Sequence, residues 1–153
     1  MESEVDIVKI SLVCSHGGHL TEIIQLMDAF RGHDIFLITY EAPSSSEIHR
    51  KYTLKNLGKN PYRFLRSIPH VFWILRRETP DIIISTGSEI AIPVFYIAWI
   101  LGIKTMFIES LCRIEEPSLT GKIVYPVSSV FLVQWKQLLN KFGKKAKYWG
   151  NVL

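Results

Sequence analysis

Three short polar turns hold the residues best suited to chemistry, and each follows an apolar run. They are Ser15-His16-Gly17-Gly18-His19, Ser85-Thr86-Gly87-Ser88-Glu89 and Glu109-Ser110. The first turn precedes a helix-like segment, where free backbone N–H groups and the helix dipole favour an anion. Histidine is the side chain best suited to proton transfer near neutral pH. The first turn therefore predicts a site that binds a phosphate or a sugar and moves a proton.

Other interpretations of the first turn remain open. It matches neither the G-x-G-x-x-G pattern of dinucleotide sites nor a Walker A loop, which disfavours an ordinary dinucleotide or ATP site. The two glycines also suit a tight strand-to-helix turn that requires positive φ and has no ligand. His16 and His19 have the spacing of a metal-binding pair, but the sequence offers no third ligand, so we expect no metal.

The second turn offers hydroxyl and N–H groups from Thr86, Gly87 and Ser88 to a sugar or diphosphate. An alternative is that Ser88 caps the following helix, with Glu89 in its first turn; the two interpretations are compatible. The turn does not match G-x-S-x-G, which disfavours a hydrolase of that type. In the third turn, Glu109 is a lone carboxylate next to Ser110.

Apolar runs and helix-like segments alternate along the chain, and they must position these turns. We predict strands, a mobile polar loop at Glu41 to Glu47, and helices at Leu20 to Phe30, Pro61 to Arg77 and Ile90 to Leu101. The predicted strands are Val5 to Cys14, Asp34 to Tyr40, Asp81 to Ser85, Lys104 to Ile108 and Ser128 to Val133. The alternation predicts a Rossmann-like α/β fold with a doubly wound parallel sheet. Ligands bind at the carboxyl ends of strands in such sheets, where the three turns lie.

Composition limits the class of protein. The chain has 153 residues, of which 48% are hydrophobic, so we expect one domain over residues 1–153 and exclude a disordered chain. The sequence lacks an apolar run of the roughly 18 to 20 residues that a membrane-spanning helix needs. Three acidic residues at the N-terminus argue against a signal peptide and favour the cytoplasm. There we expect Cys14 and Cys112 to be buried free thiols.

Basic residues concentrate in two stretches. Residues 50–77 contain eight Lys and Arg and no acid, and the helix at Pro61 to Arg77 falls inside this stretch. Helical spacing places Phe64, Leu65, Ile68, Val71, Phe72 and Leu75 on a packing side. It places Tyr62, Trp73 and Ile74 on the other side, among Arg63, Arg66, His70 and Arg77.

Arginines interleaved with exposed aromatics predict a membrane-surface helix, although Pro69 would kink or split it. The alternative is a packed helix with a solvated basic edge. The sequence contains no recognisable RNA-binding motif, so we expect no nucleic acid partner. A lysine-rich segment at residues 136–147 precedes the aromatic end Tyr148 to Leu153. This end either docks on a partner or forms a final strand or tail packed on the domain's own edge.

Taken together, these motifs resemble a known group of proteins. The group includes the PssD/CpsF-type proteins, the membrane-recruiting subunit of the dolichol-linked UDP-GlcNAc transferase and, more distantly, the N-terminal half of the MurG glycosyltransferase. The resemblance rests on residues 15–20, 81–88 and 107–110, the helix that ends at Leu101-Gly102-Ile103, Gln134-Trp135 and Tyr148-Trp149-Gly150-Asn151.

The resemblance implies a GT-B glycosyltransferase divided between two polypeptides. This chain would supply the acceptor-binding, membrane-facing half, and a partner subunit would bind most of the UDP-sugar, which is a co-substrate, so no separate cofactor is expected. The acceptor would be a saccharide on a lipid diphosphate. The eukaryotic subunit has an N-terminal anchor that this sequence lacks, so attachment to the cytoplasmic face would be peripheral.

The resemblance also assigns roles to individual residues. His19 matches a candidate base or diphosphate contact, in a loop shaped by Gly17 and Gly18, while Gly87 and Ser88 match a second glycine-rich loop. Glu109 matches the acid of a His-Glu-Gln-Asn stretch, whose other members are replaced here by Ile108, Ser110 and Leu111. Two other functions remain open: a non-catalytic accessory module of a glycosyltransferase and a small self-sufficient nucleotide-binding enzyme.

Overall fold

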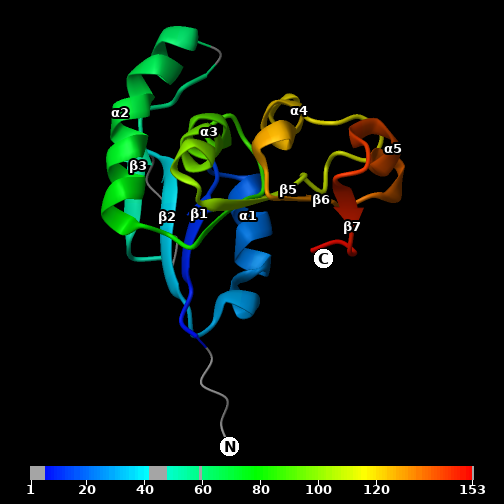
Figure 1. Ribbon diagram of the computed structural model, residues 1–153. Coiled ribbons are helices and arrows are strands. Elements are labelled where there is room, and N and C mark those ends of the chain that lie inside the picture. The colour runs from blue at the N-terminus through cyan, green and yellow to red at the C-terminus, as the bar shows by residue number, and fades with distance from the viewer. Residues whose placement is uncertain (1–5, 42–47, 59, 153) are drawn as a thin grey trace, which may run out of the picture.

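A seven-stranded sheet forms the centre of the computed structural model, which describes residues 6–41, 48–58 and 60–152 (Figure 1). The strands are β1 (Lys9–Val13), β2 (Asp34–Tyr40), β3 (Lys51–Leu54), β4 (Ile82–Ser85), β5 (Lys104–Ile108), β6 (Val130–Val133) and β7 (Ala146–Tyr148). The α-helices are α1 (Gly18–Gln25), α2 (Pro61–Glu78), α3 (Ala91–Leu101), α4 (Leu119–Val124) and α5 (Leu139–Phe142). Three 3₁₀ helices complete the described elements: η1 (Met27–Phe30), η2 (Tyr125–Val127) and η3 (Lys136–Leu138).

All neighbouring strands pair in parallel, in the order β3-β2-β1-β4-β5-β6-β7. The predicted doubly wound parallel α/β fold is therefore confirmed. The chain moves outward from β1 in one direction and, from β4 onward, in the other. The carboxyl ends of β1 and β4 thus form the topological switch point, where doubly wound sheets place their ligands.

Two apolar layers enclose the sheet. On one face, α2, α3 and α4 bury side chains such as Ile74, Phe95 and Val124 against it. On the other face, α1 and η1 contribute Ile23 and Phe30. Because both faces are covered, the central strands read as continuous apolar runs in the sequence.

The predicted boundaries hold for β2 and β5, for the start of α2 and for the ends of α3, β4 and β6, and the other predicted boundaries shift. The segment predicted as one helix from Leu20 to Phe30 is an α-helix only as far as Gln25 and continues as η1. The proposed strand start at Val5 and residues 42–47 of the predicted loop lie outside the described residues. β3 was not predicted, because its four residues lie at the sheet edge with only Leu54 fully buried.

The last strand and the residues after it show how the C-terminal segment meets the domain. β7 pairs with β6 in register Phe131 with Ala146 through Val133 with Tyr148. Beyond it, the N–H of Val152 donates to the side chain of Gln134 over 3.0 Å. Of the aromatic end, Tyr148 thus lies in the final strand and Val152 contacts the domain's own edge, while Trp149 is 68% exposed, so docking of this end on a partner stays a prediction.

The predicted packing face of α2 is wrong in part. Val71 and Leu75 are buried as expected, but Leu65, Ile68 and Phe72 are exposed. Ile74, predicted to face a membrane, is fully buried. The helix is instead rotated so that buried Glu78 accepts hydrogen bonds from Tyr52 and Lys9, a polar anchor that a count of apolar residues ignores. Pro69 lies inside α2 at an exposed position and does not split the helix.

Candidate functional site

Two hydrogen bonds join the first and second polar turns across the switch point. His19 Nδ1 lies 3.0 Å from the carbonyl oxygen of Thr86, and the Thr86 hydroxyl donates to the carbonyl of His19 over 2.8 Å. A carbonyl only accepts, so His19 Nδ1 must carry the proton in this bond. In the neutral ring, Nε2 is then the unprotonated nitrogen, which is the form a general base requires.

Gly87 provides the space for the His19 ring. A Cβ at Gly87 would lie 2.5 Å from His19 Cε1 and 2.8 Å from Nδ1, closer than van der Waals contact allows. Gly87 also has φ of 131°, and the next residue, Ser88, has φ of 73° although it carries a side chain. The second turn is therefore a strained backbone segment that lets His19 approach it closely.

Ser88 does not cap α3, so the capping interpretation of the second turn is wrong. The cap position is Ile90 and has no side-chain hydrogen bond, while the Ser88 hydroxyl donates to Glu89 over 2.8 Å. The other carboxylate oxygen of Glu89 accepts from Tyr40 over 3.1 Å. Burial and the nearby Glu89 carboxylate raise the pKa of Tyr40 above its usual range. Tyr40 therefore remains a neutral hydrogen-bond donor at neutral pH.

His16 and Ser15 shape the first turn rather than face the cleft. His16 Nε2 lies 2.7 Å from the carbonyl of Tyr40, and the Ser15 hydroxyl donates to the carbonyl of His16. Gly17 has φ of 83°, immediately before α1 begins at Gly18. These contacts fix where the first turn of α1 points.

A cleft of about 760 Å³ lies at the carboxyl ends of the strands. Among the predicted site residues, those lining it are Gly18, His19, Gly87, Ser88 and Ser110. Ser15, His16, Gly17, Thr86 and Glu109 support the loops around it and do not line it. Cys112 also lines the cleft and is exposed, so the expectation that both thiols are buried is wrong for Cys112. Cys14 is buried as expected, and burial raises the pKa of its thiol to about 12.

Glu22 lines the cleft and was missed by the sequence interpretation. Its Oε1 accepts hydrogen bonds from the Ser110 hydroxyl at 2.8 Å and from the N–H of Leu111 at 3.2 Å. Its Oε2 accepts from the Gln134 side chain over 3.4 Å. Glu22 is three residues after His19 on α1, so the two side chains share a helix face, and this spacing is the signal that could have found it.

Glu109 is enclosed beneath the cleft. Its carboxylate is fully buried and accepts from the N–H groups of Ser110 and Ser118 and from the Ser118 hydroxyl, each over 3.0 Å. The same Ser118 hydroxyl accepts from the N–H of Gly121, which caps α4. In this structure Glu109 therefore holds the segment between β5 and α4.

The described residues contain no group of three or more His, Cys, Asp and Glu side chains that could hold a metal ion. No helix within residues 6–41, 48–58 and 60–152 has the length and hydropathy for a membrane crossing.

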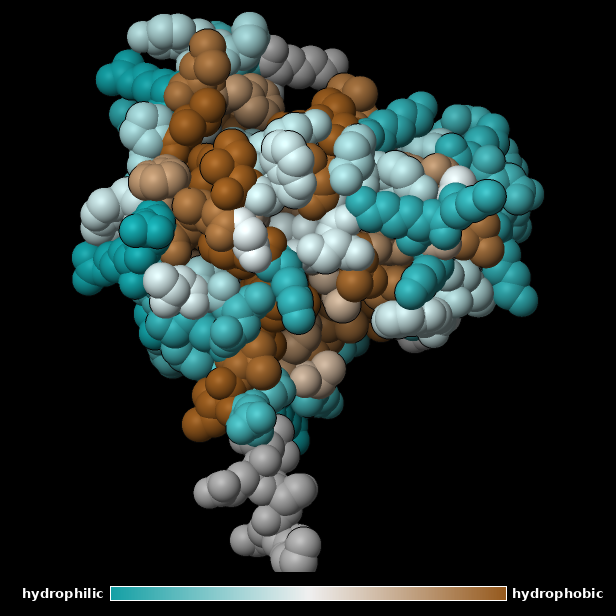
Figure 2. Space-filling view, in the orientation of Figure 1, coloured by the Kyte–Doolittle hydropathy of each residue, from teal (hydrophilic) through white to brown (hydrophobic). Residues whose placement is uncertain are grey.

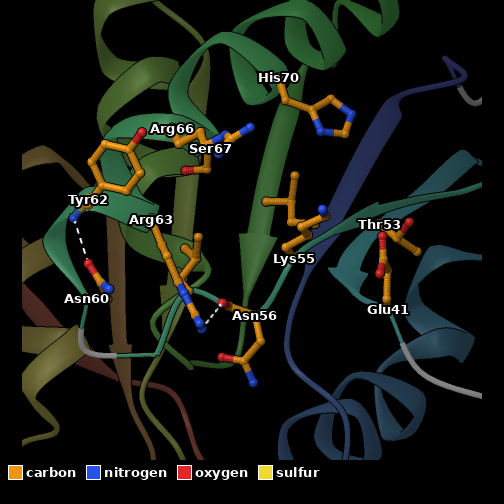
Figure 3. A pocket seen from close by; sticks show the side chains of 12 residues that line it. Glu41, Thr53, Lys55, Asn56, Asn60, Tyr62, Arg63, Arg66, Ser67 and His70 are labelled. Atoms are coloured by element: carbon orange, nitrogen blue, oxygen red, sulfur yellow. Dashed lines mark hydrogen bonds between the residues drawn. The ribbon is translucent and has the colours of Figure 1, made fainter.

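Of the predicted membrane-facing residues, Tyr62, Arg63, Arg66, Trp73 and Arg77 are exposed on α2, and Ile74 is not. Arg77 lies over the Trp73 ring at 5.1 Å, and Trp73 packs edge-on against Tyr52 of β3. A second cavity, of about 650 Å³, lies between the start of α2 and the segment after β3 (Figure 3).

The family described as "Oligosaccharide biosynthesis protein Alg14 like" matches residues 48–152 of this chain. The chain belongs to the Alg14-like family. Its Rattus norvegicus relative, named UDP-N-acetylglucosamine transferase subunit ALG14, is 27% identical over 93% of this chain and 82% of that protein. These matches confirm the predicted similarity to the UDP-GlcNAc transferase subunit; the PssD/CpsF part of the resemblance stays a prediction.

The Alg14-like chain is also similar to longer proteins. An undecaprenol-pyrophosphoryl N-acetylglucosamine transferase of Geobacillus kaustophilus is 29% identical over 97% of this chain but only 38% of that transferase. Acinetobacter baumannii MurG has the same fold over 95% of this chain and 46% of its own, with a TM-score of 0.78 and 12% identity. A UDP-GlcNAc 2-epimerase from Methanocaldococcus jannaschii matches with a TM-score of 0.74 and 15% identity, over 94% of this chain and 45% of its own. The Alg14-like chain thus spans less than half the length of these solved proteins.

Proposed function

We propose that this chain is the acceptor-binding subunit of a two-subunit UDP-sugar glycosyltransferase in oligosaccharide biosynthesis. The observation that carries the proposal is the geometry of His19, whose Nδ1 bonds to Thr86 and whose ring lies at the cleft on the switch point. The donor is UDP-GlcNAc or a related sugar nucleotide. The acceptor is a saccharide on a lipid diphosphate.

His19 acts as general base in the proposed reaction. Its Nε2 takes the proton of the acceptor hydroxyl while that oxygen bonds to the anomeric carbon of the donor sugar, and the bond from that carbon to the diphosphate of UDP breaks. The Thr86 carbonyl holds the Nδ1 proton and stabilises the imidazolium that forms. N–H groups of the first turn favour the negative charge of the acceptor diphosphate.

A partner subunit binds most of the UDP-sugar in this proposal. Two observations support this. Similar proteins are named as transferase subunits, and the match to the Geobacillus kaustophilus transferase covers 97% of this chain but only 38% of that transferase. In such an arrangement the two chains together enclose donor and acceptor, and the cleft of this chain faces the partner.

Exposed apolar side chains on α2 and α3 support peripheral attachment to the cytoplasmic membrane surface. Leu65, Ile68 and Phe72 form a stripe on α2, and α3 packs beside it with Trp99 and Ile100 more than 60% exposed. Figure 2 shows a brown, hydrophobic band over α2 and α3. Contiguous apolar surface next to arginines is typical of a face that enters the headgroup region.

A reconstitution assay tests the proposed reaction. UDP-GlcNAc-dependent transfer to a lipid-diphosphate saccharide is measured with this chain alone, with its co-purifying partner alone and with both. We expect activity only with both. Activity from this chain alone would contradict the two-subunit proposal, and full activity of a complex that carries His19→Ala would favour a non-catalytic accessory role.

Vesicle co-sedimentation tests the membrane attachment separately. Leu65→Gln with Phe72→Gln removes two side chains of the α2 stripe, whereas Ile7→Gln with Ile24→Gln removes two exposed apolar side chains elsewhere on the molecule. We expect the first variant to lose about tenfold or more in vesicle affinity, the scale of burying two large apolar side chains, and the second to bind as the wild type does. Equal binding by both variants would show that α2 is not the attachment face.

A further inference from the structure

The 650 Å³ cavity beside α2 has the composition of an anion site. Lys55, Arg63 and Arg66 line it, and Glu41 is the one acidic side chain among the lining residues that the structure describes. His70 completes the basic side one turn further along α2 (Figure 3). The three α2 side chains are spaced at i, i+3 and i+7, so the helix directs all of them to the same side.

These cations are not neutralised by acidic side chains within the described part of the chain. The ion pairs found there involve Lys9, Arg31, Arg50 and Lys141, and none involves a cation of the cavity. Arg63 is oriented by a hydrogen bond of 3.1 Å from its Nη1 to the carbonyl of Asn56. Its remaining N–H groups and those of Arg66 suit phosphate oxygens.

The size of the cavity indicates that the ligand is larger than a phosphate. Volumes of about 300–1,000 Å³ hold ligands of many atoms. Thr53, Asn56 and Asn60 add hydroxyl and amide groups to the lining, and such groups bind sugar or polyol hydroxyls. The cavity therefore combines partners for a phosphate with partners for hydroxyl groups attached to it.

The surroundings of the cavity indicate that this phosphate belongs to a lipid. Tyr62 lines the cavity and is 66% exposed, and Leu65 on the next turn begins the apolar α2 stripe. Asn56 lines both this cavity and the cleft that contains His19. A ligand here can thus lie between the apolar helix surface and the candidate acceptor site.

We propose that this cavity binds the sugar- or polyol-bearing phosphate headgroup of a lipid whose tail lies along the apolar stripe of α2. This inference rests on the membrane attachment proposed above and adds a specific headgroup site to it. Two lipids have the required chemistry: a bulk phospholipid with a polyol headgroup, and the saccharide-bearing lipid diphosphate that serves as acceptor.

Vesicles of equal surface charge separate a headgroup site from general attraction. One set contains phosphatidylinositol, a second contains the same molar fraction of phosphatidylserine, and a third adds a trace of a polyprenyl-diphosphate saccharide to the second. We expect tighter binding, by about tenfold, to the first or the third set than to the second, the scale of one to two charge-assisted hydrogen bonds. Preference for the first set identifies a phospholipid, and preference for the third identifies the acceptor lipid.

Two double variants with the same loss of charge provide the decisive comparison. Arg63→Gln with Arg66→Gln changes the cavity, and Arg76→Gln with Arg77→Gln changes exposed arginines of the same helix outside it. We expect both to weaken binding to all anionic vesicles, and only the cavity variant to lose the headgroup preference. A wild type that binds all three sets equally, or equal retention of the preference in both variants, would overturn the inference.

A soluble probe keeps this inference distinct from the proposed attachment. Glycerophosphoinositol should shift the NMR resonances of the His70 ring in the wild type and not in the cavity variant, whether or not vesicles bind. Vesicle binding without headgroup preference and without this shift would leave the attachment standing and refute the cavity. The shift without any vesicle binding would support the cavity and refute the attachment.

Discussion

Charged side chains pair with one another at the amino end of the sheet, whereas titratable side chains line an open cleft at its carboxyl end. At the amino end, Lys9, Asp34, Arg50 and Glu78 pair with one another across β1, β2 and α2. At the carboxyl end, His19 and Glu22 line an open cleft and are held mainly by loop backbone and neutral side chains. These four charges at the amino end therefore neutralise one another, whereas His19 at the carboxyl end faces a space that a ligand can enter.

This difference separates stability from function in one small sheet. Changes at the amino end should alter the free energy of unfolding and its pH dependence while the proposed transfer continues. Changes at His19 and Gly87, at the carboxyl end, should alter transfer by more than their cost in stability.

His19→Ala should have the largest effect. We expect transfer by the reconstituted complex to fall by about 10²-fold or more, because the base that accepts the acceptor proton is lost. The measurement is kcat of the complex with wild-type or variant chain, with thermal unfolding as the control for folding. A loss of activity that is fully explained by a lower folded fraction would assign His19 to loop structure.

Gly87→Ala should come next, and Gly32→Ala is its matched control. Both glycines have positive φ, 131° and 84°, but only at Gly87 would the new Cβ meet the His19 ring. We expect Gly32→Ala to destabilise the fold by about 1 kcal/mol and Gly87→Ala by about 2 kcal/mol or more. Transfer should fall only in Gly87→Ala, because only that substitution displaces the ring. Similar activity losses in both variants would show that the contact with His19 is unimportant.

Glu22→Gln tests whether this buried carboxylate holds the strand ends together. The amide would place an N–H group against the side-chain N–H of Gln134, so we expect a loss of about 1–3 kcal/mol in chemical unfolding. Glu115→Gln, at an exposed position, should change the free energy of unfolding by less than about 0.5 kcal/mol. Equal stabilities of the two variants would contradict a positioning role for Glu22.

The amino-end network should produce the smallest effect. Burial alone would raise the pKa of Glu78, but hydrogen bonds from Tyr52 and Lys9 and the charge of Arg50 lower it below its ordinary value of 4.5. A carboxyl group with a lowered pKa stabilises the fold fully above that ordinary value, and this contribution is lost as pH falls through the lower folded value. Glu78→Gln should therefore remove about 0.5–1 kcal/mol at neutral pH and flatten the acid side of the stability curve. An unchanged pH dependence would show that the network does not contribute to the free energy of unfolding. A strong loss of transfer would contradict the separation of stability at the amino end from function at the carboxyl end.

The fold was predictable because its central elements are buried on both sides. The apolar run Asp34–Tyr40 matches β2 residue for residue, and Lys104–Ile108 matches β5. The edge strand β3 is only partly buried, so its sequence lacks a continuous apolar run. The rotation of α2 was not predictable from apolar spacing, because the bonds of Glu78 to Tyr52 and Lys9 help fix it.

The candidate site was predictable where glycine and histidine cluster in the sequence, as at His19 and Gly87. Glu22 was missed because its partners, Ser110 and Gln134, are distant in the sequence and meet it only in the folded sheet. The basic cavity was missed for a similar reason. Its lining residues come from α2 and from the segment after β3, and these two parts of the chain lie side by side only in the folded protein.

Hydrogen–deuterium exchange with a water-soluble analogue of the acceptor, a saccharide on a short-chain lipid diphosphate, tests the central claim most directly. The account predicts that the analogue slows exchange in residues 15–20 and 86–90, at the carboxyl end, and leaves the amino-end residues Lys9, Asp34 and Arg50 unchanged. Protection confined to the amino end, or no protection of residues 15–20 and 86–90, would contradict it.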